Sequence, residues 1–89
     1  MDKFKISALK KVDKQLKRIH PNDKKKVFEF FSKLTNSPFP KGSDIIKMAG
    51  AKDTYRVRLG KIRVIYTVLA EKKEIIITKV KYRKAAYRN

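Results

Sequence analysis

Three arginines occupy two neighbouring segments of this 89-residue chain. Arg56 and Arg58 precede the dipeptide Gly60-Lys61, and Arg63 follows it. A two-residue turn at that dipeptide would place Arg58 directly opposite Arg63 in an antiparallel hairpin, with Arg56 on the same face. Directly opposed like charges destabilise a sheet by a few tenths of a kcal/mol to about 1 kcal/mol, so the fold gains nothing from this pairing. Because guanidinium groups donate two parallel hydrogen bonds to phosphate oxygens, the pattern predicts a phosphate-binding face.

The charge of the whole chain favours the same interpretation. Lysine and arginine number 25 against 8 acidic residues, which gives a formal net charge of +17. No acid lies between Thr54 and Ala70 or between Ile75 and Asn89, so we expect the three arginines to have no acid nearby. A small domain with this charge repels itself unless a polyanion neutralises it, and nucleic acid is the predicted partner. An acidic protein partner, a solvated lysine-rich surface and a solvated outer face of arginines are the alternatives.

The C-terminal segment adds cations and tyrosines to the candidate site. Arg83 and Tyr87 lie four residues apart, and Tyr82 precedes them. Tyrosines among cations can stack on bases or, when positive neighbours lower the phenol pKa, transfer protons. The alternative for Tyr82 and Tyr87 is that both rings pack the chain end on the core. The further candidate RNA contacts are Lys61, Lys79, Lys81, Tyr82, Lys84 and Arg88.

Several other catalytic sets are missing from the sequence. His20 is the single histidine and precedes Pro21 at a helix end, where a cap or surface role is expected, so a paired-histidine ribonuclease is excluded. The acids of the second half are scattered in turns and cysteine is absent, so we expect no metal, no cofactor and no small-molecule ligand. A nuclease built from Arg, Lys and Tyr stabilises the extra negative charge of the transition state but is poorly suited to proton transfer at neutral pH. Such an enzyme is expected to be slow unless another molecule completes or orients its site.

Hydrophobic periodicity predicts the elements that position these residues. Strands are expected at Phe4–Ala8, Ile45–Met48, Thr54–Leu59, Ile62–Leu69 and Ile75–Val80, and helices at Leu9–Ile19 and from Pro21 to Leu34. The order β-α-α-β-β-β-β predicts one α+β domain over residues 1–89, with a helical hairpin on one face of a small, mostly antiparallel sheet. The other face would be concave and free of helices, and would hold RNA. With no cysteine, no apolar N-terminal region and no run long enough to span a membrane, we expect a cytoplasmic protein without a membrane partner.

Four segments, in this order and spacing, resemble the RelE/ParE toxin superfamily. They are ALKKVDKQLKRI (Ala8–Ile19), NSPFPKG (Asn36–Gly42), YRVRLGKIRVIYTV (Tyr55–Val68) and KVKYRKAAY (Lys79–Tyr87). The resemblance implies a RelE-like fold and a toxin of a type II toxin–antitoxin module. The implied activity is ribosome-dependent, metal-independent cleavage of messenger RNA in the A site by 2′-hydroxyl attack, which inhibits translation. The implied partners are a RelB-like antitoxin, expected to be acidic, together with messenger RNA and the ribosome with its ribosomal RNA.

The resemblance also implies roles for five residues. Arg63 stands where the RNase-active members have a central phosphate-binding arginine, and Arg56 and Arg58 match two basic positions that contact the cleaved phosphate. Arg83 matches the arginine after the last strand, which stabilises the transition state or protonates the leaving group. Tyr87 matches the C-terminal tyrosine that activates the 2′-hydroxyl or stacks on a base.

Two features depart from the family pattern. Lys81-Tyr82 stands where a Gly-His or Gly-Lys pair commonly precedes the last arginine, and the chain stops at Asn89, with little room for a C-terminal helix. Two other functions therefore stay open. One is a ParE-like poison of DNA gyrase, in which the catalytic positions are typically lost. The other is a noncatalytic basic module that binds nucleic acid, which the charge alone would favour.

Overall fold

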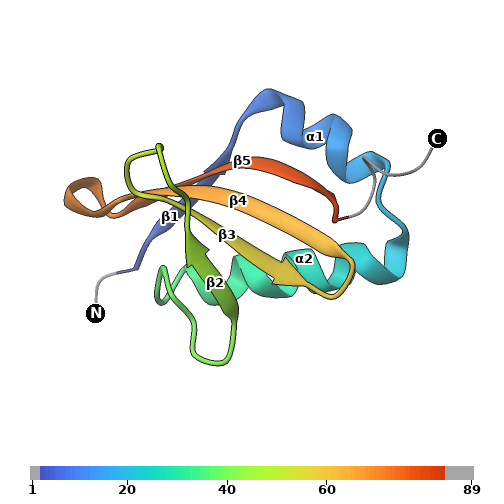
Figure 1. Ribbon diagram of the computed structural model, residues 1–89, viewed down its shortest axis with the longest axis horizontal. Coiled ribbons are helices and arrows are strands. Elements are labelled where there is room, and N and C mark those ends of the chain that lie inside the picture. Colours follow the sequence, from blue (N-terminus) through green and yellow to red (C-terminus); the bar gives the residue numbers. More distant parts are fainter. Residues whose placement is uncertain (1–2, 84–89) are drawn as a thin grey trace.

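The computed structural model describes residues 3–83, which form a five-stranded sheet with two helices (Figure 1). The elements in chain order are β1 (Lys5–Ala8), α1 (Lys10–Lys17), α2 (Pro21–Leu34), β2 (Asp44–Lys47), β3 (Thr54–Leu59), β4 (Ile62–Leu69), a 3-10 turn (Ala70–Lys72) and β5 (Glu74–Tyr82). The strands lie in the order β1-β5-β4-β3-β2; β1 is parallel to β5, and the other neighbouring pairs are antiparallel. The predicted element order and mostly antiparallel sheet are confirmed. Neither helix within residues 3–83 is long and apolar enough to cross a membrane.

The second helix begins at a proline that suits its first turn. Pro21 has the fixed φ that this position requires and lacks an N–H that would otherwise have no partner there. His20 caps the helix, because its Nδ1 accepts a hydrogen bond from the Asn22 N–H at 3.1 Å. The capping role expected for this histidine is therefore confirmed.

Both helices cover the same face of the sheet. Helix α1 packs along β5 (Figure 1), and α2 packs against β4. The sheet side chains that face the helices are buried: Val57, Ile62, Val64, Tyr66, Val68, Ile75, Ile77 and Val80. Burial of each aliphatic side chain contributes roughly 1.5–3 kcal/mol, so this face fixes the register. The residues between them in each strand must point to the other face.

One irregularity in the sheet changes which side chains of β5 reach that other face. Ile65 pairs with Lys79 and Tyr66 pairs with Ile77, so Thr78 has no partner residue on β4. Its hydroxyl donates a hydrogen bond to the Ile65 carbonyl at 3.2 Å. A bulge of this kind shifts the alternation of a strand by one residue. Before the bulge the odd-numbered residues of β5 face the helices, and after it the even-numbered residues do.

The first half of β5 pairs with β1, and α1 covers the second half. The β1 pairing ends at Ile77. Beyond it, Gln15 of α1 accepts a hydrogen bond from the Val80 N–H through its Oε1 at 2.8 Å. A glutamine side chain therefore replaces the missing neighbouring strand at this position.

Candidate nucleic-acid interface

The β3–β4 hairpin places its three arginines on the face away from the helices. Arg58 lies opposite Arg63, and Arg56 lies opposite Ile65, with a turn in which Gly60 has a φ of +61°. This is the register that the two-residue turn predicted. Arg56 and Arg63 are half-buried among their neighbours, whereas Arg58 is exposed. Folding therefore brings the three guanidinium groups onto two adjacent strands of one open face.

The bulge in β5 adds two lysines to this face. Lys81 lies opposite Arg63 and Lys79 lies opposite Ile65. Without the extra residue at Thr78, the alternation set by the buried Ile77 would turn both lysines toward the helices. We call the outward side chains of Arg56, Arg58, Arg63, Lys79 and Lys81 the arginine face.

An acid from a third strand contacts the arginine face. Asp44 of β2 lies opposite Arg58. Its Oδ2 accepts a hydrogen bond from Nε of Arg58 at 2.8 Å and forms an ion pair with Nη2, also at 2.8 Å. The expectation that no acid lies near the three arginines is therefore wrong. It rested on the acid-free segments of the sequence, and the carboxylate comes from a separate strand, which pairs with β3 only in the folded chain.

Arg56 and Arg63 each carry an Nε atom that is covered and has no hydrogen-bond partner among the described residues. A buried donor without a partner costs a fold about 1–3 kcal/mol. Natural proteins accept costs of this kind mainly at functional sites. Unlike Arg58, whose Nε donates to Asp44, these two arginines have no such partner among the described residues, so the stability of the fold does not explain their position.

Arg83 lies at the end of the arginine face, beside the β3–β4 turn. Its backbone N–H donates to the Lys61 carbonyl at 2.7 Å, and its Nη1 donates to the Gly60 carbonyl at 3.2 Å. These two bonds fix both the backbone and the guanidinium of Arg83 against the turn. Lys61 is exposed at the same turn. The structure therefore brings both predicted residues to one end of the arginine face.

Tyr82 lies on the opposite side of the sheet. It pairs with Ile62, and its ring packs against the core. Its hydroxyl donates to Asp23 Oδ2 at 3.3 Å and accepts a hydrogen bond from the His20 N–H at 3.0 Å. The bulge turns this side chain toward the helices and away from the arginine face, which is the arrangement that the packing alternative predicted.

Comparison with known proteins decides the family. Residues 3–87 match the family model described as the ParE toxin of the type II toxin–antitoxin system parDE. The chain belongs to the RelE/ParE toxin superfamily. Within it, a Methanocaldococcus jannaschii protein that bears the name toxin RelE1 is 42% identical over 88 residues, which cover 98% of each chain.

Solved structures of RelE toxins share the fold of this chain. The toxin in the archaeal RelE–RelB complex from Pyrococcus horikoshii is 35% identical, with a TM-score of 0.82 over 93% of this chain and 98% of that chain. The RelB–RelE antitoxin–toxin complex from Methanococcus jannaschii gives 27% identity and a TM-score of 0.76, over 90% of this chain and 93% of that chain. The predicted RelE-like fold is confirmed.

Three of the site residues predicted from the sequence lie outside the described residues. They are Lys84, Tyr87 and Arg88. Within residues 3–83, no three His, Cys, Asp or Glu side chains lie close enough together to hold a metal ion. The described part of the site therefore consists of the arginine face, Asp44, Lys61 and Arg83.

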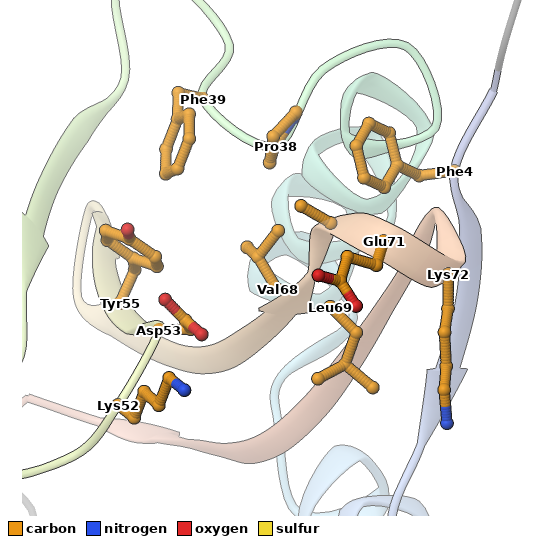
Figure 2. Close-up of a pocket in the computed structure, with 11 residues that line it drawn as sticks. Phe4, Pro38, Phe39, Lys52, Asp53, Tyr55, Val68, Leu69, Glu71 and Lys72 are labelled. Carbon is orange, nitrogen blue, oxygen red and sulfur yellow. The ribbon is translucent and has the colours of Figure 1, made fainter.

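A pocket lies at the end of the β3–β4 hairpin away from the Gly60-Lys61 turn (Figure 2). It measures about 520 Å³. Its lining is largely apolar, with two lysines and two acids among the lining residues: Phe4, Pro38, Phe39, Tyr55, Val68, Leu69, Ala70, Lys52, Asp53, Glu71 and Lys72. Phe39 and Tyr55 meet edge to face at 4.8 Å between ring centroids. No pattern in the sequence predicted this pocket, and it shares no side chain with the arginine face.

Proposed function

We propose that this chain is the toxin of a RelBE-type module and cleaves messenger RNA in the ribosomal A site. The observation that carries the proposal is the arginine face itself, five cations on the helix-free side of β3, β4 and β5. Opposed cations oppose folding, and two of their Nε groups are covered without a partner, so a ligand is the simplest reason for the arrangement. A phosphodiester backbone matches the geometry of guanidinium donors.

The proposed reaction is attack of a ribose 2′-hydroxyl on the adjacent phosphate, which yields a cyclic phosphate and a free 5′-hydroxyl. Charge accumulates on the phosphate oxygens as the 2′-oxygen bonds to phosphorus. Arg63 lies between Arg58 and Lys81 on the middle strand of the face, and in the proposed reaction it stabilises that charge. In the proposed reaction Arg83, whose Nη1 donates to the Gly60 carbonyl, interacts with the departing 5′-oxygen. The ribosome would supply the orientation of the messenger.

The proposed protein partner is a RelB-like antitoxin. Two of the similar solved structures are complexes of RelE with RelB. The net charge of +17 supports an acidic antitoxin, since complementary charge speeds association and selects the partner. Binding of such a chain over the arginine face would compete with RNA phosphate.

The test is primer extension on messenger RNA in translating ribosome complexes. Wild-type protein is expected to cut within the A-site codon, and Arg63→Ala is expected to cut at least about 100-fold more slowly, as for removal of one oxyanion donor. Lys14→Ala is the matched control, because it removes one positive charge from the exposed surface of α1, far from the arginine face. It should cut at the wild-type rate.

The same experiment separates the two other functions. The matching family model bears the ParE name, so gyrase poisoning is the specific alternative. Wild-type protein that binds RNA but leaves ribosome-bound messenger intact would overturn the nuclease proposal. Gyrase-dependent DNA breaks by that protein would then identify a ParE-type activity, and the absence of such breaks would leave a noncatalytic binding module.

A further inference from the structure

The proposed set of cations has no group suited to accept a proton at neutral pH. Arginine and lysine side chains are protonated there and act as donors. The structure adds a carboxylate that the sequence did not predict at this place. Asp44 lies in the row Asp44, Arg58, Arg63, Lys81 across four neighbouring strands. Glu74 also faces outward, but it lies opposite Leu69, at the far end of β4 from Arg63.

The geometry of the Asp44–Arg58 pair leaves both partners able to bind a substrate. Nε of Arg58 donates to Oδ2 of Asp44 and Nη2 forms an ion pair with the same oxygen, so Oδ1 has no hydrogen bond from the described residues. The other edge of the guanidinium, with Nη1 and the second proton of Nη2, stays available for a phosphate. The two side chains are 41% and 51% exposed, so RNA can reach both. One guanidinium can therefore hold a phosphate on one edge and a carboxylate on the other.

We propose that Asp44 is the general base of the reaction, an inference that rests on the proposed function. Asp44 accepts the proton of the 2′-hydroxyl whose neighbouring phosphate Arg58 binds. The 2′-oxygen then bonds to phosphorus, and the bond from phosphorus to the 5′-oxygen breaks. Water protonates the departing 5′-oxygen, and Asp44 returns its proton to water, so the enzyme is restored. A C-terminal tyrosine is then not needed as the base.

The first measurement is the single-turnover rate of cleavage on programmed ribosomes. Asp44→Asn should lower the rate by about 10²–10⁴-fold, the range for loss of a general acid or base, while binding to the ribosome is not weakened. Asp44→Glu should restore a large part of the rate, because it keeps the carboxylate. Asp13→Asn, the same change of an exposed acid on α1, on the helix side of the sheet, is the matched control and should cut normally.

A second measurement separates proton transfer from mere positioning of Arg58. Asp44→Gly opens space beside an exposed guanidinium, so small bases added to the solution can enter. Imidazole accepts a proton but, being neutral, does not form an ion pair with Arg58. Cleavage by Asp44→Gly should therefore rise with imidazole concentration at constant ionic strength. If neither imidazole nor formate restores cleavage at any concentration, the lost group is not a proton acceptor and the proposal is overturned.

The remaining outcomes are also decisive. If wild type and Asp44→Asn cut at the same rate, Asp44 is not the base, although the proposed nuclease function stands. If wild type itself does not cut, the proposed function fails and the base assignment fails with it. Comparison of the unfolding midpoints of Asp44→Asn and wild type in urea shows whether a lost rate reflects a lost fold.

Discussion

Replacement of Arg63 by methionine should stabilise the fold while it abolishes cleavage. Arg63 is flanked in its row by Arg58 on one side and Lys81 on the other. Its Nε is covered and has no hydrogen-bond partner among the described residues. Methionine keeps an unbranched side chain of similar length, so the contacts of the aliphatic stem with the neighbouring strands are largely retained. The substitution therefore removes mainly the charge and the unsatisfied donor.

The size of the gain follows from these two contributions. Each directly opposed pair of like charges costs roughly 0.2–1 kcal/mol, although Asp44 already offsets part of the charge of Arg58. Relief of a covered donor adds on the order of 1 kcal/mol, and the weaker strand preference of methionine subtracts a fraction of this. A net gain of about 1 kcal/mol is expected. For a domain of this size, that corresponds to a rise in melting temperature of about 4–8 °C.

Urea unfolding followed by circular dichroism measures this gain directly. The gain should shrink as salt is raised from 0.1 M to 1 M, because the Debye length falls from about 10 Å to about 3 Å. Arg58→Met is the matched control and should gain less or nothing, because it leaves Asp44 without its partner. If Arg63→Met unfolds at a lower urea concentration than wild type at both salt concentrations, the arginine stabilises the fold and the reasoning is refuted.

Two further predictions concern buried polar groups of the sheet. Burial raises the pKa of the Tyr66 phenol well above its usual value, with a smaller contribution from Tyr55, and the hydroxyl donates to the Pro38 carbonyl at 2.8 Å. Above about pH 10 the unfolded chain loses this proton and the folded chain keeps it, so the free energy of unfolding should fall with rising pH. Urea midpoints measured between pH 8 and 11 should show a smaller fall for Tyr66→Phe than for wild type. Gln15→Met removes the acceptor of the Val80 N–H and should lower the free energy of unfolding by about 1–3 kcal/mol, with faster hydrogen exchange of that amide.

The sequence was sufficient to predict the β3–β4 hairpin because local rules determine it. A glycine in the left-handed region at Gly60 and a two-residue turn fix every pair from Leu59–Ile62 outward. The alternation of apolar and cationic residues then decides which face is buried. Arg58 and Arg63 could therefore be placed opposite each other from their spacing alone.

The contact of Asp44 with Arg58 could not be predicted in the same way. Six residues, Met48 to Asp53, join β2 to β3, so no two-residue turn fixes the register of this pair. The expected strand also began at Ile45, one residue too late to include the acid. An aspartate directly before an alternating apolar pair was the available signal, but aspartate is disfavoured in strands and usually marks their ends.

The bulge at Thr78 is the second feature that escaped prediction, and it explains why Tyr82 lies on the helix side of the sheet. The run Ile75–Ile77 offers apolar side chains to both faces, so it gives no alternation from which a shift could be detected. Thr78 itself is a good strand former, and its bond to the Ile65 carbonyl exists only in the folded sheet. Bulges arise from pairing between strands, and one residue of shift exchanges every side chain between the two faces.

The position of Asp44 on an edge strand has a consequence for how the face can act on a phosphate. An acid on β3 or β5 beside Arg63 would neutralise the central cation and cancel much of its attraction for phosphate. From the edge, Asp44 reaches Arg58 alone, and its bonds to Nε and Nη2 draw this guanidinium toward β2. Arg63 and Lys81 keep their full charge in the same row. The face can thus hold a base and still remain strongly cationic, because the base is separated from the central arginine by one strand.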